Sequence, residues 1–293
     1  MPPTSTSPDQ LLPADLSMGA VTLRVADLEA MTAYYRDALH LVVQSSIAGQ
    51  VTLGRRQVPV VVLQHAPELR HAGPRQAGLF HTAVLFETEA DLAAAVYAVA
   101  TRHPGSFTGS ADHLVSKAFY FTDPEGNGVE LYTDRDRTTW SWTHGTVEMA
   151  SLLLDPQQYL REHLDEQAVA LADDRPAAVG HVHLCVGDVD TARAFYVDQL
   201  GFATTSEWSG QALFVSAGGY HHHMAMNTWT SRGAGRRRAT LGLGLVRIQL
   251  GTGDELGALG ERLARHRVPL ADDGRTLSFD DPWSNRIEVS ASA

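Results

Sequence analysis

Apolar and polar positions alternate and then recur at helical spacing in two matching stretches of the chain. These are "LRVADLEAMTAYYRDALHL" (23–41) and "LCVGDVDTARAFYVDQLGF" (184–202). The alternation predicts a strand, and the spacing of about 3.6 residues after it predicts a helix. Asp27 and Asp188 stand between the two patterns, where a carboxylate can cap the first turn of the helix.

A second pair of stretches predicts hairpins that close such a unit. "FYFTDPEGNGVELY" (119–132) and "LSFDDPWSNRIEVS" (277–290) each read as a strand, an Asp-Pro turn containing Asn, and another strand. Proline fixes the turn's first φ angle, and Asn or Gly tolerates its tight backbone. The last strand of each carries one glutamate, Glu130 or Glu288.

A third, weaker pair completes the repeat. "GLFHTAVLFETEADLAAAVYAVA" (78–100) and "GLGLVRIQLGTGDELGALGERLA" (242–264) again predict a strand before a helix, and His81 matches Leu245. The chain therefore predicts an α+β fold of four βαβββ units. We call them units A (18–66), B (78–134), C (179–229) and D (241–290).

These units divide the chain into two predicted modules. The first spans 18–134 and the second 179–293, and a helical linker at 135–178 joins them. The segment 1–17 is rich in Pro, Ser and Thr and has no secretory-signal pattern, which predicts a disordered tail.

Composition narrows the class of protein. The formal net charge of −11 argues against nucleic-acid binding, which needs Lys and Arg to neutralise phosphates. The sequence contains no run of about 18 apolar residues, so no membrane span is predicted. The single cysteine, Cys185, excludes an internal disulfide, and we expect a cytoplasmic location.

The chain resembles the vicinal oxygen chelate superfamily, which includes glyoxalase I, bleomycin-resistance proteins and type I extradiol dioxygenases. More specifically, it resembles two-module bacterial proteins of the catechol 2,3-dioxygenase type. The resemblance covers nearly the whole chain after the tail, and these stretches carry it: "GLFHTAVL", "DHLVSKAFYFTDPEGNGVELYTDRDRTTW", "GHVHLCVGDVDTARAFYVDQLGF" and "LFVSAGGYHHHMAMNTW". It implies that paired units form two half-open β-sheet cups with helices outside.

The resemblance also implies metal ligands near the start of a unit's first strand and on its last strand. Units B and C carry the suitable residues there, namely His81, Glu130 and His181. We therefore favour pairing of B with C. If C paired with D instead, Glu288 would be the reserve ligand.

Two histidines and one carboxylate suit non-haem Fe(II), with Mn(II) as a plausible substitute. Strand alternation predicts that His181 and His183 face the cup. In "YHHHMAMN" (220–227), Met224 and Met226 mark the helix side. His221 and His223 would then face the cup and His222 would face away.

The resemblance implies an acid/base next to the metal, and an imidazole titrates near neutrality. His221 or His223 is the candidate, with Tyr220 and Asn227 as hydrogen-bond partners. His183 is expected to orient the substrate.

His113 is expected at the rim of the cup, with a functional and a structural role equally weighted.

The predicted function is Fe(II)-dependent extradiol cleavage of a catechol-type aromatic with O₂. Two alternatives stay open: a glyoxalase-like metal lyase or isomerase that uses no O₂, and a metal-free binding protein. In the familiar dioxygenases the second module supplies all three ligands, whereas unit D here lacks the first-strand histidine. A homodimer through exposed sheet edges is a further expectation.

Overall fold

The computed structural model describes residues 11–292, and it contains all four βαβββ units in the predicted order. Unit A contains β2 (Val21–Val25), α1 (Leu28–Ala33), the π-helical turn η2 (Tyr34–Ala38), β3 (Val42–Ile47), β4 (Gln50–Arg55) and β5 (Val58–His65). Unit B contains β6 (Gly78–Phe86), α2 (Glu89–Arg102), β7 (Phe107–Asp112), β8 (Ser116–Thr122) and β9 (Gly128–Asp134).

The second half of the chain repeats this plan. Unit C contains β12 (Ala177–Cys185), α5 (Val189–Arg193), the π-helical turn η5 (Ala194–Gln199), β13 (Ala203–Trp208), β14 (Ala212–Ser216) and β15 (Met224–Asn227). Unit D contains β16 (Gly242–Leu250), α6 (Gly253–Arg265), β17 (Leu270–Asp272), β18 (Thr276–Asp280) and β19 (Arg286–Ala291). The α+β class is therefore confirmed.

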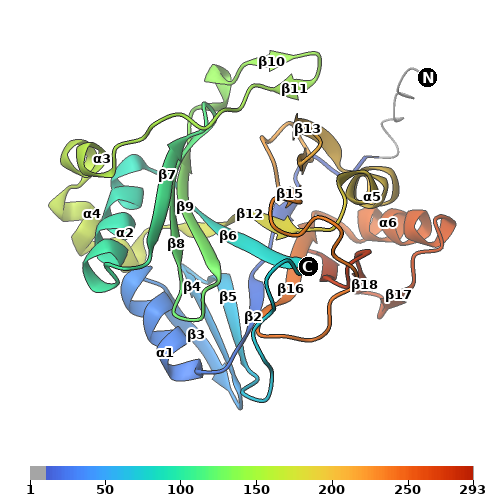
Figure 1. The fold of residues 1–293 in the computed structure, drawn as a ribbon, viewed down its shortest axis with the longest axis horizontal. Coiled ribbons are helices and arrows are strands. Elements are labelled where there is room, and N and C mark those ends of the chain that lie inside the picture. The colour runs from blue at the N-terminus through green and yellow to red at the C-terminus, as the bar shows by residue number, and fades with distance from the viewer. Residues whose placement is uncertain (1–10, 293) are drawn as a thin grey trace.

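Units from opposite halves of the chain share each large sheet. Strands β6 and β12 pair antiparallel and join units B and C into an eight-stranded sheet, the B–C sheet. Strands β2 and β16 likewise join A and D into a nine-stranded sheet, the A–D sheet, which includes β1 (Ser17–Met18). The predicted pairing of B with C is confirmed, and both sheets curl into cups with helices on their flanks (Figure 1).

Two aspartates begin the first helices of units A and C as predicted. The Asp27 carboxylate accepts a hydrogen bond from the backbone N–H of Ala30 at 2.9 Å, and Asp188 accepts one from Thr191 at 2.8 Å. Each cap satisfies a backbone donor that has no partner within the helix. The aspartates thereby fix where strand becomes helix.

Hydrogen bonds between units tie the two sheets together. In the turn after β8, Asp123 accepts hydrogen bonds from backbone and side chain of Asn127 and from the Tyr35 hydroxyl of unit A at 3.1 Å. In the matching turn of unit D, Asp281 accepts the Tyr196 hydroxyl of unit C at 3.0 Å. The repeated Asp-Pro turns therefore hold neighbouring units as well as closing hairpins.

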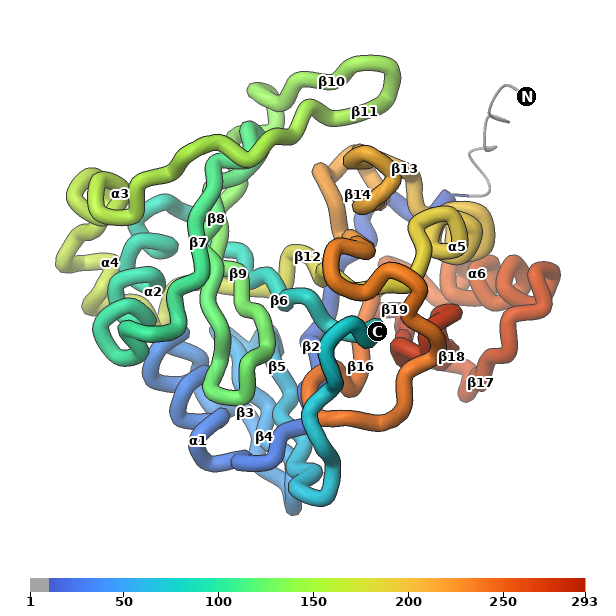
Figure 2. The backbone as a smooth tube through the Cα atoms, in the orientation of Figure 1, coloured from blue at the N-terminus to red at the C-terminus, as the bar shows by residue number. Residues whose placement is uncertain are grey.

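The predicted linker contains a hairpin and helices. The chain passes through η3 (Arg137–Thr139), β10 (Trp142–Thr143) and β11 (Thr146–Val147) to α3 (Pro156–His163), α4 (Glu166–Ala170) and η4 (Ala172–Asp174). The tube in Figure 2 follows it from the hairpin to α3 and α4, which pack against α2. The helical part of the predicted linker consists of two short α-helices, because Asp165 begins a new helix by accepting a hydrogen bond from the backbone N–H of Ala168.

The predicted tail lies mostly in residues 1–10, outside the described residues. From residue 11 onward the chain packs on the core instead. Leu12 and Leu16 are buried, and Ser17 pairs with Gln249 in β1. Burial of these two leucines favours the packed arrangement of this short segment.

Side chains on β9 and β12 alternate as the sequence predicted. Val129, Leu131, Val182 and Leu184 belong to the large hydrophobic core. The residues between them therefore point to the opposite face of the B–C sheet. No helix among residues 11–292 is both long enough and apolar enough to cross a membrane.

Candidate metal centre

Three adjacent strands of the B–C sheet each contribute one side chain to a compact cluster. His81 lies on β6, Glu130 on β9 and His181 on β12. Ala83 on the central strand is the register partner of both Glu130 and His181, and it is fully buried. Because its side chain is a single methyl group, the three longer side chains can meet in front of it.

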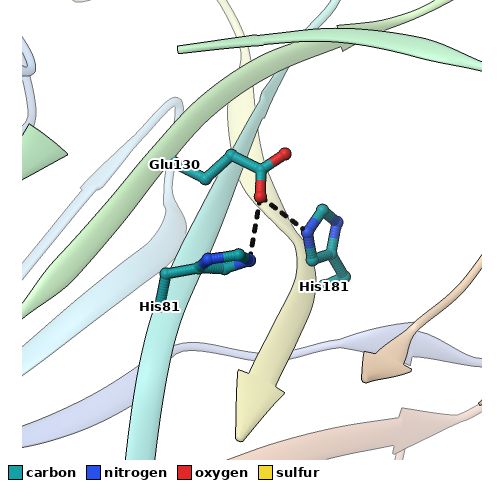
Figure 3. Close-up of side chains that lie close together, drawn as sticks. All are labelled: His81, Glu130 and His181. Atoms are coloured by element: carbon teal, nitrogen blue, oxygen red, sulfur yellow. Dashed lines mark hydrogen bonds and ion pairs between the residues drawn. The ribbon is translucent and has the colours of Figure 1, made fainter. Parts of the chain in front are cut away.

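The polar atoms of the cluster converge on one point (Figure 3). Glu130 Oε2 lies 2.8 Å from His81 Nε2 and 3.1 Å from His181 Nε2. The three candidate ligand atoms all lie within 4.8 Å of one another. Among residues 11–292 this is the one such group of three found.

Hydrogen bonds alone do not satisfy all three polar atoms of the cluster, whereas a bound cation would. His181 Nε2 is hydrogen-bonded to Glu130, but His81 Nε2 makes no hydrogen bond of acceptable angle despite its short distance to the carboxylate. A buried polar atom without a partner is costly. A divalent cation between the three atoms would satisfy all of them at once.

A backbone irregularity aims His181 into the cluster. The pairing of β12 with β6 shifts register between Val179 and His181, at Gly180. A Cβ on Gly180 would lie 1.7 Å from the Tyr132 hydroxyl, so only glycine fits there. Such a bulge turns the next side chain relative to a regular strand.

The electrostatics favour the protonation states that metal ligands need. Burial lowers the pKa of His181 to about 4, so its imidazole is neutral at neutral pH. Burial alone would raise the pKa of Glu130, but the two neighbouring imidazoles outweigh it and hold that pKa well below its usual range. Neutral imidazoles and an ionised carboxylate are the forms that bind metal.

The cluster lies in a cavity of about 560 Å³. His113 and His183 also line this cavity, as the sequence predicted for the cup. The remaining walls are mostly apolar, and their large members are Phe80, Tyr120, Phe121, Met149, Trp208, Phe214 and Trp229. The arrangement suits an apolar ligand with polar atoms at one end.

His183 has a defined tautomer. The Asn227 side-chain amide accepts the backbone N–H of Trp229 through Oδ1, so its Nδ2 group donates to His183 Nε2 at 3.0 Å. The imidazole proton then resides on Nδ1. Burial also holds the pKa of His183 well below its usual value, which keeps the ring neutral.

His113 forms a pair with Tyr120. His113 Nδ1 donates to the carbonyl oxygen of Ala150 at 2.6 Å, which leaves Nε2 to accept the Tyr120 hydroxyl at 2.7 Å. Tyr120 is the register partner of Glu130 on the neighbouring strand. The pair therefore lies one strand away from the cluster, on the same face of the sheet.

The three consecutive histidines differ from expectation. The prediction that His222 faces away from the cup is wrong, because His222 lines the cavity and its ring centroid lies 4.1 Å from that of His181. His221 and His223 are not among the lining residues. Strand β15 begins only at Met224, so alternation does not extend back through residues 220–223.

The other members of that segment make buried contacts behind the cavity. His221 contacts Asp134 through Nε2 at 3.0 Å and His222 through Nδ1 at 2.7 Å. Tyr220 donates to the same Asp134 oxygen at 3.2 Å. His223 Nδ1 lies 2.9 Å from the Ser216 hydroxyl and accepts the backbone N–H of Ala217.

The equivalent place in the A–D sheet has no such cluster. Ala20 and Leu245 occupy the positions that match His181 and His81. Glu288, the predicted reserve ligand, lies 3.4 Å from the Arg247 guanidinium. Unit C does not pair with unit D, so Glu288 belongs to the other sheet.

Sequence reasoning missed Tyr120 and His222 as cavity residues. Tyr120 had a usable signal, because Phe119 before it is buried in the core and alternation turns Tyr120 to the cavity. His222 had none, because its orientation depends on the turn before β15.

Comparison with known proteins agrees with this fold. The family model described as "Glyoxalase/Bleomycin resistance protein/Dioxygenase superfamily" matches residues 17–131 and 178–289, and the chain belongs to this superfamily. A curated relative, "Catechol-2,3-dioxygenase" from Bacillus subtilis (strain 168), is 33% identical over 277 residues, which cover 92% of this chain and 95% of the relative.

Solved structures share the fold at lower identity. Glyoxalase I from Zea mays is 13% identical with a TM-score of 0.56, and the match covers 94% of this chain and 92% of that one. The cppA protein from Streptococcus pneumoniae TIGR4 is 11% identical with a TM-score of 0.57, over 96% and 99% of the two chains. At these identities the likeness concerns the fold alone.

Proposed function

We propose that the chain is a metal-dependent extradiol dioxygenase that uses O₂ to cleave the ring of a catechol-type aromatic. The observation that carries this proposal is the cluster of His81, Glu130 and His181 within an apolar cavity of about 560 Å³. The relative at 33% identity, named as a catechol-2,3-dioxygenase, supports the same reaction class.

The donor set fits a non-haem Fe(II), and Mn(II) accepts the same donors. His81 Nε2 makes no hydrogen bond, and Glu130 Oε2 makes short contacts with both imidazoles, which supports this fit. When bound there, the metal would supply the Lewis-acid and redox chemistry that ring cleavage by O₂ requires. The protein's own side chains would bind, orient and move protons around it.

His183 is suited to orient the substrate. Because Asn227 donates to its Nε2, its Nδ1–H is left to donate to an oxygen in the cavity. The ring lies between His81 and Phe80, with centroid separations of 4.9 Å to each. This packing restrains the ring and so directs the donor.

The Tyr120–His113 pair is suited to accept a proton. A catechol hydroxyl proton would pass to the Tyr120 oxygen while the Tyr120 proton moves to His113 Nε2. The resulting imidazolium would keep its Nδ1–H bond to Ala150. An imidazole is effective in this role because its ordinary pKa lies near neutrality.

His222 replaces His221 and His223 as the candidate next to the metal ligands. His221 would then act as a positioning residue, since it links His222 to Asp134. A buried hydrogen-bonded chain of this kind fixes the orientation of the imidazole that faces the cavity.

The test is reconstitution without oxygen. Protein purified anaerobically is loaded with Fe(II), given catechol and then exposed to O₂, while O₂ uptake and the visible spectrum are recorded. The proposal predicts one O₂ consumed per yellow ring-fission product. Bound metal without O₂ uptake across a panel of catechols would favour a glyoxalase-like reaction. Absence of bound metal would favour a binding protein.

A further inference from the structure

We infer that the substrate is an uncharged catechol with an apolar substituent larger than a methyl group, and not a catechol that carries a carboxylate. This inference rests on the proposed function, because it assigns the two hydroxyls to the end of the cavity where His81, Glu130 and His181 meet. It concerns what fills the rest of the cavity.

The first argument is size. A cavity of about 150 Å³ is enough to hold a benzene ring in a protein interior. The cavity here measures about 560 Å³. A bare catechol would therefore leave more than half of the cavity filled with water or empty. Neither water nor empty space makes favourable contacts with apolar walls.

The second argument is charge. Among the residues that line the cavity there is no lysine and no arginine, and Glu130 is the only carboxylate. The other polar lining groups are imidazoles, hydroxyls, indole N–H groups and backbone. A substrate carboxylate buried there would lose its hydration without gaining a cationic partner, which is strongly unfavourable.

The third argument is the position of the aromatic side chains. Phe80 and Trp229 contact each other edge to face at 5.3 Å, and Trp208 contacts Phe214 at 5.0 Å. His183 contacts rings of both pairs, Trp229 at 5.4 Å and Phe214 at 5.9 Å. The two aromatic pairs therefore extend from the metal cluster. They provide apolar surface that a substituent on the substrate can contact.

The exposure of two of these rings supports a bound apolar group. Phe80 is 36% exposed and Trp229 is 43% exposed, although both line the cavity. Large apolar side chains gathered at the edge of a cavity are typical of a binding surface. A substituent that covers them gains affinity for each methylene group buried.

A neighbouring polar hollow provides the competing explanation. It is lined by Arg75 and Arg237, and Gly126 borders both it and the main cavity. Arg237 already donates to Asn285 Oδ1 and to the Leu243 carbonyl oxygen. Both of its terminal nitrogens therefore already donate within the protein, which argues against its use by a substrate carboxylate.

The experiment compares two catechols of similar length, 4-butylcatechol and 3-(3,4-dihydroxyphenyl)propionate, with catechol itself. Binding to the Fe(II)-loaded protein is measured without O₂ by quenching of tryptophan fluorescence, since Trp208 and Trp229 both line the cavity. Turnover is then measured as O₂ uptake. We expect the butyl compound to exceed the propionate by at least about 100-fold in kcat/KM and catechol by roughly tenfold.

A variant ties the preference to the aromatic side chains. Trp229→Ala is expected to reduce the advantage of the butyl compound over catechol by roughly tenfold. Trp142→Ala is the matched control, because Trp142 is similarly exposed, at 40%, and does not line the cavity. This control is expected to keep the full advantage.

The outcomes separate the inference from the proposed function. Preference for the propionate would overturn the inference and point to Arg75 and Arg237. Equal affinity for catechol and 4-butylcatechol would overturn it as well. A butyl preference in binding without O₂ uptake from any catechol would support the apolar cavity and overturn the dioxygenase proposal.

Discussion

The B–C sheet and the A–D sheet are built from the same repeat, yet they present different chemistry at the same place. On β6 the position between the candidate ligands is Ala83, which leaves room for three side chains to meet. On β16 the matching position is Arg247, the register partner of Glu288. Its guanidinium contacts that glutamate and donates to the Thr22 hydroxyl.

This difference shows that the repeat sets the backbone arrangement of both sheets, whereas a few side chains determine the chemistry at the equivalent position of each. In the A–D sheet the glutamate keeps its place, but a permanent cation from Arg247 compensates its charge. In the B–C sheet two imidazoles face the glutamate in place of a permanent cation, which leaves its charge available to an external cation. The predictions below test this contrast, from the largest expected effect to the smallest.

The same substitution at equivalent positions gives the largest contrast. Glu130→Gln removes the only carboxylate of the cluster, so we expect loss of bound metal. Activity should fall by at least about 1000-fold, which exceeds the 10- to 100-fold loss typical when a residue that hydrogen-bonds to a metal ligand is replaced. Glu288→Gln should keep both. Metal per chain and O₂ uptake are the measurements, and metal loss only in Glu288→Gln would refute the assignment of the centre to the B–C sheet.

Removal of the metal should lower stability through the same cluster. At a free metal concentration of 100 times Kd, binding stabilises the folded state by about 2.7 kcal/mol. Urea unfolding with Fe(II) under anaerobic conditions and with a chelator should show this difference in the unmodified chain and in Glu288→Gln. In Glu130→Gln the two curves should coincide, and a remaining metal effect there would show binding elsewhere.

The sequence predicted the fold well because local patterns encode it. The Asp caps, the Asp-Pro turns and the strand alternation each act over a few residues, and each occurs in both halves of the chain. The pairing of B with C followed from where histidines and glutamate fall in the repeat. That pairing also brings His81, Glu130 and His181 together.

The surroundings of the cluster were harder to predict. His222 enters the cavity because residues 217–223 form an irregular segment of turn and bends before β15, and such a segment has no fixed alternation. The His113–Tyr120 pair depends on the Ala150 carbonyl, which the linker brings back to β7. Contacts between segments distant in sequence leave no periodic signal in a single chain.

A smaller contrast concerns the hydroxyl opposite each glutamate. Tyr120 is the register partner of Glu130, and Ser278 is that of Glu288. Tyr120→Phe should lower kcat by about 100-fold because it interrupts proton transfer to His113, while metal content and KM change little. Ser278→Ala should leave kcat unchanged. A Tyr120→Phe effect confined to stability or metal content would indicate a structural role only.

The smallest effect is expected from the ion pair of the A–D sheet. The side chains of Arg247 and Glu288 are 36% and 31% exposed, so solvent screens their attraction and Arg247→Met should cost less than about 1 kcal/mol. The measurement is the urea midpoint at unchanged slope, together with metal per chain, which should stay the same. A loss of several kcal/mol would mean that the ion pair holds the A–D sheet together, and the two sheets would then differ in what stabilises them as well as in their chemistry.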